Sequence, residues 1–547
     1  MTTSGSEYTI LVRPSVEKQW VGGGSVRLTV YNLTDEDKNI STIEFDVAQG
    51  QTVSNNVGLV VVQQGQRVTG TVESWKRKIP AHGTNFVIVT YSGTLDPLPR
   101  NIKVDGVPAD VPEYDTPPTP VTDLRVERVL GRSVLLDWTP STDEVAVIEY
   151  HITVNMPGRD PVVVTGPPAL VGRLTPETDY EATVVAMNIR GLFSSPTTIE
   201  FNSGEPKGER PAWDIPVMPF IDYAGGNTVS GDWHINEITP IAQATGVRGV
   251  SLGFITVAND QMEPCWGSIP TYDAINGKHN ADDVRAFKEL GGRPVISIGG
   301  WTNHIAEYVH TDVERVYGWY SAILDAYDID RIDFDIEGAA QKDKAFLARH
   351  ISIVLMLLDA RPQLRISYTL PVDAGRERRP ADVYGPDDPN CPPDLVAGFN
   401  TDGQAFIGML ADAGILPSLF NGMTMTMGNA NRPQGTEAVI ATRFMHRTVK
   451  QAYPHLTDAE VWARLGACPM YGINDGGERF HEQDMHDLVA HARDVRLGSI
   501  GGWDAQRDWN SNRTTTKCGV DSGDISQCTW EPQTPGTYLK IEAAYQV

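Results

Sequence analysis

The sequence predicts an α/β protein in which a (β/α)8 TIM barrel is preceded by two all-β sandwich domains. Residues 206–547 alternate short apolar stretches with amphipathic helical ones. Residues 1–113 and 114–205 instead alternate β-rich runs with turns made of Gly, Asn and Asp. A chain of 547 residues is long enough for several such domains.

The first segment, residues 1–113, contains β-rich runs such as "VRLTVYNL" and "FVIVTYSG". Through "VESWKRKIPAHGTNFVIVTYSG" it resembles the family 2 carbohydrate-binding modules. Such modules present a flat row of tryptophans, because the apolar face of a sugar stacks on an aromatic ring. The resemblance implies that Trp20 and Trp75 belong to such a row. The alternative is that both side chains pack inside the sandwich.

The second segment, residues 114–205, consists of a Pro-rich linker, "PEYDTPPTPVTD", followed by a further β-rich stretch. The stretch "SVLLDWTPS" places Trp138 on an alternating strand, and "LTPETDYEATVVAMN" places Leu174, Pro176 and Tyr180 at the spacing of a tyrosine corner. This segment resembles a fibronectin type III domain. In such a domain these residues form the core and the corner, so we expect the segment to act as a spacer.

The third segment, residues 206–547, contains eight candidate strands in order: "VMPFIDYA", "GVSLGFIT", "RPVISIGG", "RIDFDIE", "RISYTLPV", "GMTMTMG", "ACPMYGIN" and "GSIGGWD". Eight strand–helix units are typical of a (β/α)8 barrel, whose chemistry gathers at the C-terminal ends of the strands. The residues at those ends are Tyr223, Glu337, Met425, Asn474 and Trp503.

The fourth strand carries acids that alternate with apolar residues, in "DRIDFDIEG". Side chains alternate along a strand, so Asp333, Asp335 and Glu337 share one face, which points into a barrel. Burial and mutual repulsion should raise at least one carboxyl pKa, which keeps a general acid protonated near neutral pH. A buried acid cluster bridged by arginine or water is the alternative. Two carboxylates on one strand also lie on the same side of a substrate, so a nucleophile must come from elsewhere.

At this point "DRIDFDIE" resembles the DxxDxDxE signature of glycoside hydrolase family 18, and "SIGG", which begins at Ser297, resembles its SxGG motif. The resemblance spans roughly residues 213–545. It implies a retaining chitinase in which the 2-acetamido oxygen of the substrate attacks the anomeric carbon. It further implies that Glu337 is the general acid/base, that Asp335 orients the acetamido group, and that Asp333, supported by Ser297, shares a proton with Asp335.

The same resemblance implies further sugar contacts. Trp503 in "GGWDAQRD" would form the floor beneath the sugar, Tyr223 would lie near the same subsite, and Asn474 and Asp475 in "PMYGIND" are further candidates. On the sixth strand the family often shows Met-x-Tyr-Asp, whereas this chain has Met425 and Thr426 in place of the tyrosine and the acid. We assign Met425 a lining role only, because a missing hydrogen-bond donor weakens transition-state stabilisation.

The connection between the seventh and eighth strands is short, with about 22 residues from Asn474 to Arg496. It has no room for the small α+β insertion that deepens the cleft of some family members. We therefore expect an open groove, which favours endo-acting cleavage within chains.

We expect no nucleic-acid partner, because a net charge of −25 would repel a phosphate backbone. We expect no membrane span, because no apolar run is long enough to form one. We expect no metal and no cofactor, and a possible disulfide between Cys518 and Cys528. The expected partner is chitin or another N-acetylglucosamine polymer. We expect an extracellular location although no signal peptide can be read, and association with a larger secreted assembly is not excluded.

Three hypotheses remain open from the sequence. The first is a modular endochitinase. The second is a catalytically weak chitin-binding protein. Met425 and Thr426 favour this hypothesis, whereas Glu337 and Asp335 are evidence against it. The third keeps the mechanism and changes the substrate to the chitobiose core of glycans or to peptidoglycan.

Overall fold

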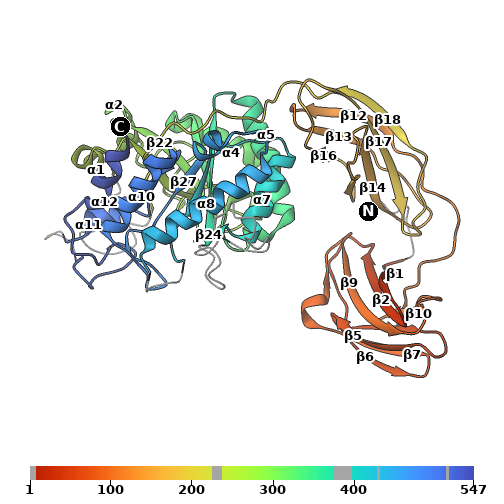
Figure 1. The fold of residues 1–547 in the computed structure, drawn as a ribbon. Helices are drawn as coiled ribbons and strands as arrows, with labels where there is room; N and C mark the ends of the chain where they lie inside the picture. The colour runs from red at the N-terminus through yellow and green to blue at the C-terminus, as the bar shows by residue number, and fades with distance from the viewer. Residues whose placement is uncertain (1–7, 225–236, 374–396, 428–431, 513–516, 547) are drawn as a thin grey trace. The chain divides into compact units, whose positions relative to one another are not determined.

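The computed structural model describes residues 8–224, 237–373, 397–427, 432–512 and 517–546, which form two compact units (Figure 1). Unit 1 consists of residues 1–129 and 133–204, and unit 2 of residues 130–132 and 205–547. Unit 1 contains the two predicted β segments, and unit 2 contains the predicted barrel.

The first β segment of unit 1 has two main antiparallel sheets that enclose an aliphatic core. Strands of both sheets contribute to this core; on β2, for example, Val26, Leu28 and Val30 are buried in it. One sheet has the order β1 (Ile10–Trp20), β2 (Gly23–Asn32), β9 (Thr84–Ser92) and β5 (Thr52–Val57). The other has the order β11 (Val107–Pro108), β10 (Arg100–Val104), β4 (Thr42–Asp46), β7 (Arg67–Val72) and β6 (Leu59–Gln64). A separate pair joins β3 (Lys38–Asn39) to β8 (Lys78–Ile79), beside the 3-10 helix η1 (Ser74–Lys76).

The second β segment also has two sheets with a core between them. Trp138 is buried against Tyr150, and the backbone N–H of Thr175 donates to the Tyr180 hydroxyl at 2.9 Å, as a corner built on that tyrosine requires. One sheet joins β12 (Thr122–Val129), β13 (Val134–Thr139) and β16 (Ala169–Val171). The other joins β15 (Val162–Val164), β14 (Val147–Val154), β17 (Asp179–Asn188) and β18 (Thr197–Asn202).

Unit 2 is built on eight parallel strands that follow one another around a curled sheet. Their order is β19 (Phe220–Asp222), β20 (Gly249–Thr256), β22 (Arg293–Gly299), β23 (Arg331–Asp335), β24 (Arg365–Asp373), β26 (Leu419–Met423), β27 (Leu465–Ala467) and β30 (Ser499–Ile500). The N–H of Met218 donates to the carbonyl of Ile500, and that of Phe220 donates to Gly502. The last strand thus meets the segment that enters the first, which is consistent with the predicted barrel.

Helices lie around this sheet, most of them between successive strands and the last ones after β30 (Figure 1). They are α1 (Ile238–Thr245), α2 (Ala281–Glu289), α3 (Ala306–Val309), α4 (Val313–Tyr327), α5 (Lys344–Ala360), α7 (Thr401–Asp412), α8 (Gln434–Ala452), α9 (Asp458–Trp462), α10 (Glu482–Val495), α11 (Ala505–Asn510) and α12 (Thr537–Ala543), with the 3-10 turns η3 (Ala340–Lys342) and η4 (Ala544–Gln546). Short strands β21 (Cys265–Trp266), β25 (Gly398–Phe399), β28 (Gly472–Ile473) and β29 (Arg479–Phe480) pair beside it. Among the described helices, none has the length and apolar character to cross a membrane.

All eight predicted strand stretches overlap these parallel strands in the predicted order, but the seventh meets β27 only at Ala467, and the rest of it, including Asn474, lies beyond that strand. The sixth differs in its bounds, because β26 ends at Met423 and Met425 and Thr426 lie beyond it. Thr426 has a φ of 48°, a left-handed conformation that does not continue a strand. The two residues therefore belong to the wall above the strand end.

Candidate active site

The acids of β23 lie on the face of the strand that points inward, as the alternation predicts. Asp333 is fully buried and Asp335 is 5% exposed, while Phe334 points outward and packs against Tyr320 and Tyr368. Glu337 follows two residues after the strand ends and is half-buried. The period of two thus separates a packing face from a carboxyl face.

Asp333 is surrounded by hydroxyl groups from the neighbouring strands. It pairs in register with Ser297 on β22 and with Ser367 on β24. The hydroxyls of Ser297 and Ser367 donate to its carboxylate at 2.8 and 2.6 Å, and the Thr369 hydroxyl lies 3.0 Å from Oδ1. Burial raises the pKa of Asp333 to about 6, and these three hydroxyls oppose the rise because they stabilise the charged form.

Asp335 and Glu337 form a hydrogen-bonded carboxyl pair at the end of β23. Burial, followed by the charges of Glu337 and Asp333, raises the pKa of Asp335 well above its usual range. Burial raises the pKa of Glu337 to about 7, and the hydrogen bond from Asp335 opposes this rise. Both shifts favour retention of a proton by the pair near neutral pH. Oδ1 of Asp335 is buried and has no hydrogen-bond partner in the part of the chain that the structure describes.

A cavity of about 900 Å³ opens above this pair at the C-terminal ends of the strands. Its size is at the upper end of the usual range for ligand sites. Five lining residues are each the last of a barrel strand, namely Asp222, Thr256, Gly299, Asp335 and Met423. Of the predicted site residues, the cavity brings together Asp335, Glu337, Met425, Asp475 and Trp503.

Trp503 lies at the cavity as part of an aromatic stack. Its ring is 5.5 Å from that of Phe254, with an angle of 11° between the planes, and 6.0 Å from that of Phe220. Hydrogen bonds of its backbone to Pro469 and Tyr471 fix the peptide on which the ring is mounted. A ring held in this way offers a rigid stacking surface.

Two predicted sugar contacts lie outside the cavity lining. Tyr223 is fully buried, and its hydroxyl donates to Asp283 at 2.6 Å. Asn474 is 3% exposed, and its amide donates to the carbonyls of Met470 and Gly472. The Asn474 oxygen accepts from the N–H of Thr426 at 3.0 Å. The polar groups of both side chains are hydrogen-bonded within the protein, and neither residue lines the cavity.

The cavity also includes residues that the motifs did not single out. Trp301 directly follows the "SIGG" motif, is 79% exposed, and its ring lies 3.5 Å from where a Cβ on Gly338 would stand. Phe254, Cys468 and Ser526 line other parts of the wall. The adjacency of Trp301 to the motif could have revealed it, whereas Ser526 carries no sequence signal.

The remaining features of the site concern metal ligands and a disulfide. Within the described residues, no group of three or more His, Cys, Asp or Glu side chains is placed to hold a metal ion. Cys518 and Cys528 form a disulfide.

Comparisons with known proteins follow the same division of the chain. Residues 11–108 match the family described as "Cellulose binding domain", and residues 117–200 match the family described as "Fibronectin type III domain". The chain carries both of these domains. The matched segments lie within the two predicted β segments.

Relatives of the chain include two curated proteins named as chitinases. The "Probable bifunctional chitinase/lysozyme" of Escherichia coli (strain K12) is 26% identical over 362 residues, which are 59% of this chain and 37% of the relative. "Endochitinase 11" of Metarhizium anisopliae is 25% identical over 359 residues, which are 59% of this chain and 64% of the relative. The chain thus spans about a third to two thirds of their lengths. These relatives confirm the predicted resemblance to a chitinase.

A solved structure of active domain 2 of a chitinase from Pyrococcus furiosus is 25% identical, covers 62% of this chain and 97% of that chain, and has a TM-score of 0.47.

In the cellulose-binding domain, Trp20 and Trp75 are 45% and 63% exposed, so they do not pack inside the sandwich. Trp20 ends β1, and Trp75 lies on η1. The ammonium group of Lys76 lies 5.0 Å from the centre of the Trp75 ring and 3.7 Å from that of Phe86 on β9. Both tryptophans are available to a ligand.

Proposed function

We propose that the barrel of unit 2 is an endo-acting chitinase that hydrolyses β-1,4 linkages of N-acetylglucosamine with retention, by substrate-assisted catalysis. The observation that carries the proposal is that the Asp335 and Glu337 carboxyls lie together in a cavity that an aromatic stacking surface, the Trp503 ring, also lines. The relatives named as chitinases support it.

In the first step Glu337 donates its proton to the glycosidic oxygen, and the bond to the anomeric carbon breaks. The acetamido carbonyl oxygen of the same sugar attacks that carbon and closes an oxazolinium ring. The unpartnered Oδ1 of Asp335 accepts the acetamido N–H and so stabilises the positive charge that develops on the ring. Asp335 is the last residue of β23 and Glu337 lies two residues beyond it, so both carboxyls lie on the same side of a bound sugar and Asp335 cannot itself attack from the opposite face.

In the second step water attacks the anomeric carbon and opens the ring, while Glu337, now ionised, takes a proton from that water. Two inversions at one carbon give net retention. The three hydroxyls on Asp333 keep it more acidic than Asp335. Its negative charge favours the proton remaining on the pair above it.

The endo mode is supported by the short connection between β27 and β30. Residues 468–498 form only the strand pair β28–β29 and the helix α10 among their described elements. No further domain covers the cavity from this connection, so an internal segment of a polymer can enter. We further propose that the chain acts outside the cell on chitin, and that Trp20 and Trp75 hold the cellulose-binding domain on the polymer.

The experiment that tests the proposal is product analysis on chitin with the parent chain and with Glu337→Gln. The parent should release short N-acetylglucosamine oligomers whose new reducing ends are first formed as the β anomer. Glu337→Gln should lose nearly all turnover, because an amide cannot protonate the leaving oxygen. The matched control is Asp330→Asn, an exposed carboxyl that precedes the same strand.

Three outcomes would contradict parts of the proposal. Equal turnover by Glu337→Gln would remove the assignment of the acid. Binding of chitin without any turnover by the parent would favour a chitin-binding protein. Release of products from bacterial cell walls or a glycoprotein, but not from chitin, would move the same mechanism to another substrate.

A further inference from the structure

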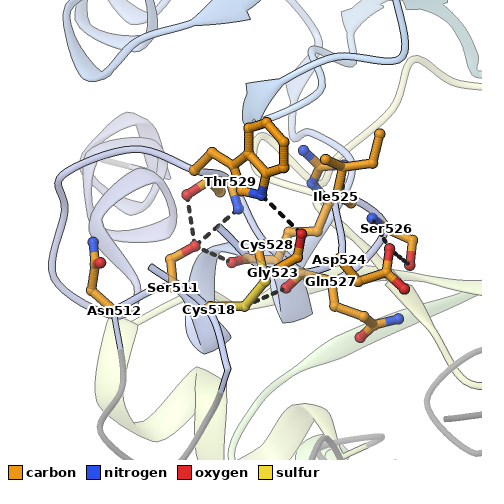
Figure 2. Close-up of a disulfide and its surroundings, with 12 residues drawn as sticks. Ser511, Asn512, Cys518, Gly523, Asp524, Ile525, Ser526, Gln527, Cys528 and Thr529 are labelled. Atoms are coloured by element: carbon orange, nitrogen blue, oxygen red, sulfur yellow. Dashed lines mark hydrogen bonds between the residues drawn. A yellow bond between two sulfur atoms is a disulfide. The ribbon is translucent and has the colours of Figure 1, made fainter. Parts of the chain in front are cut away.

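Cys518 and Cys528 close a loop (Figure 2), and this loop extends to the wall of the cavity, which Ser526 lines. Ser526 lies near the end of this loop, is exposed, and lines the cavity. Its hydroxyl and its backbone N–H both donate to Oδ1 of Asp524 at 2.9 Å. The Ser526 oxygen therefore keeps its ability to accept a hydrogen bond from a ligand.

Arg507 fixes the loop from below. It is fully buried on α11, four residues after Trp503, and its guanidinium donates to the carbonyl of Ile525 at 2.6 Å. The same guanidinium donates to the carbonyls of Tyr471 and Ile473 at 2.9 and 2.5 Å. One side chain thus holds both the loop that presents Ser526 and the stretch that leads to Asp475.

Neighbouring segments also hold the residue that follows Cys528 and the earlier part of the loop. The N–H of Ile473 donates to the carbonyl of Thr529, and the Ser511 hydroxyl lies 2.6 Å from that of Thr529 (Figure 2). The indole N–H of Trp530 donates to the carbonyl of Gly523 across the loop, and Arg479 on β29 pairs with Asp521. A loop held at both ends loses little freedom when a ligand binds, which favours affinity.

We propose that the Cys518–Cys528 loop is the rim of the substrate groove, where Ser526 accepts a hydrogen bond from a sugar unit away from the cleaved bond. Arg507 is a positioning residue, because it fixes Ser526 and Asp475 in one wall without lining the cavity itself. This inference rests on the proposed function, since it assigns a further contact to the same oligosaccharide. A rim contact affects only substrates long enough to reach it.

The test compares Ser526→Ala with the parent on N-acetylglucosamine oligomers from the dimer to the hexamer. Loss of one neutral hydrogen bond should lower the ratio of kcat/KM for the hexamer to that for the dimer by about three- to tenfold. The change should appear in KM, with kcat for the hexamer held. Ser522→Ala, an exposed serine of the same loop outside the cavity lining, is the matched control and should leave the ratio unchanged.

Two further variants test how the rim is held. Arg507→Lys keeps the charge but cannot reach three carbonyls, and the double variant Cys518→Ala with Cys528→Ala frees the loop. Both should raise KM more for the hexamer than for the dimer. A variant that merely weakened the fold would lower the rate at every length in proportion.

Direct binding separates this inference from the proposed reaction. Calorimetry of the hexamer with Glu337→Gln, and with Glu337→Gln combined with Ser526→Ala, reports the rim contact without turnover. If the parent binds oligomers but hydrolyses none, the proposed reaction is wrong. A weaker affinity of the variant that combines Glu337→Gln with Ser526→Ala would still support the rim contact. An unchanged length ratio and an unchanged affinity would overturn the rim.

Discussion

The pKa of Glu337 leads to a sharp prediction for the pH dependence of catalysis. Burial raises this pKa from its ordinary 4.5 to about 7. The general acid must carry its proton, so activity is present below this value and is lost as pH rises through it. At pH 7 about half of the Glu337 carboxyls are protonated, compared with about 0.3% for a carboxyl of ordinary pKa, roughly a 150-fold difference.

The expected magnitude follows from the same titration. About 90% of the acid is protonated at pH 6 and about 1% at pH 9, so kcat/KM should fall about 90-fold between them, approaching tenfold per pH unit above pH 7. Because Asp335 and Glu337 share a proton, the half-point belongs to the pair. The assay is the initial rate of hexamer cleavage at low substrate, followed by chromatography of the products.

A control substrate separates loss of the acid from loss of the fold. A 4-nitrophenyl glycoside has a better leaving group that needs less protonation, so its rate should decline less steeply above pH 7. A kcat/KM for the hexamer that stays level from pH 7 to pH 9, or that is already lost by pH 5.5, would refute the reasoning. Either result would mean that the buried pair does not supply the proton.

Two other predictions follow. Trp301→Ala should raise KM for oligomers about tenfold with little effect on folding, because stacking on the 79% exposed ring adds about 1 to 1.5 kcal/mol of binding. Steady-state kinetics measure this change, and replacement of the exposed Val520 by alanine is the control. An unchanged KM would contradict the prediction. Glu542→Gln should flatten the pH dependence of the melting temperature between pH 5 and pH 8. Burial raises the pKa of Glu542 from 4.5 to about 8, so the folded state binds this proton more tightly than the unfolded state does. The free energy of unfolding therefore falls by up to about 5 kcal/mol as pH rises from the lower to the higher of these two pKa values. If the melting temperatures of the parent and the variant change equally with pH, the prediction is wrong.

The barrel strands could be predicted because each is a short apolar run whose pattern is local. "GVSLGFIT" coincides with β20 residue for residue, and the acids of β23 alternate as the sequence requires. The carboxyl face could also be predicted, because a period of two fixes which side chains point together. Placement at a strand end then followed from the barrel itself.

The contacts of the loops could not be predicted in the same way. Asn474 follows β28, and its position in the sequence predicts a sugar contact. In the structure, however, its side-chain oxygen accepts a hydrogen bond from the backbone N–H of Thr426. Tyr223 follows β19, yet Asp283 on α2 accepts its hydroxyl. Ser526 lies 189 residues after Glu337 and reaches the cavity through a disulfide and a buried arginine. Such pairings depend on the tertiary fold, not on spacing.

The wall beside Met425 bears on whether the proposed site retains full activity. Met425, Met423 and Cys468 line the cavity near Asp335 with sulfur-containing, largely apolar side chains. A wall of this kind cannot donate a hydrogen bond as a tyrosine hydroxyl does, but it can pack against the methyl of an acetamido group and keep water from its carbonyl. Met425→Tyr separates the two contributions. If a hydrogen bond is what the site lacks, kcat should rise in the variant; if the apolar wall already orients the acetamido group, the larger ring should lower kcat.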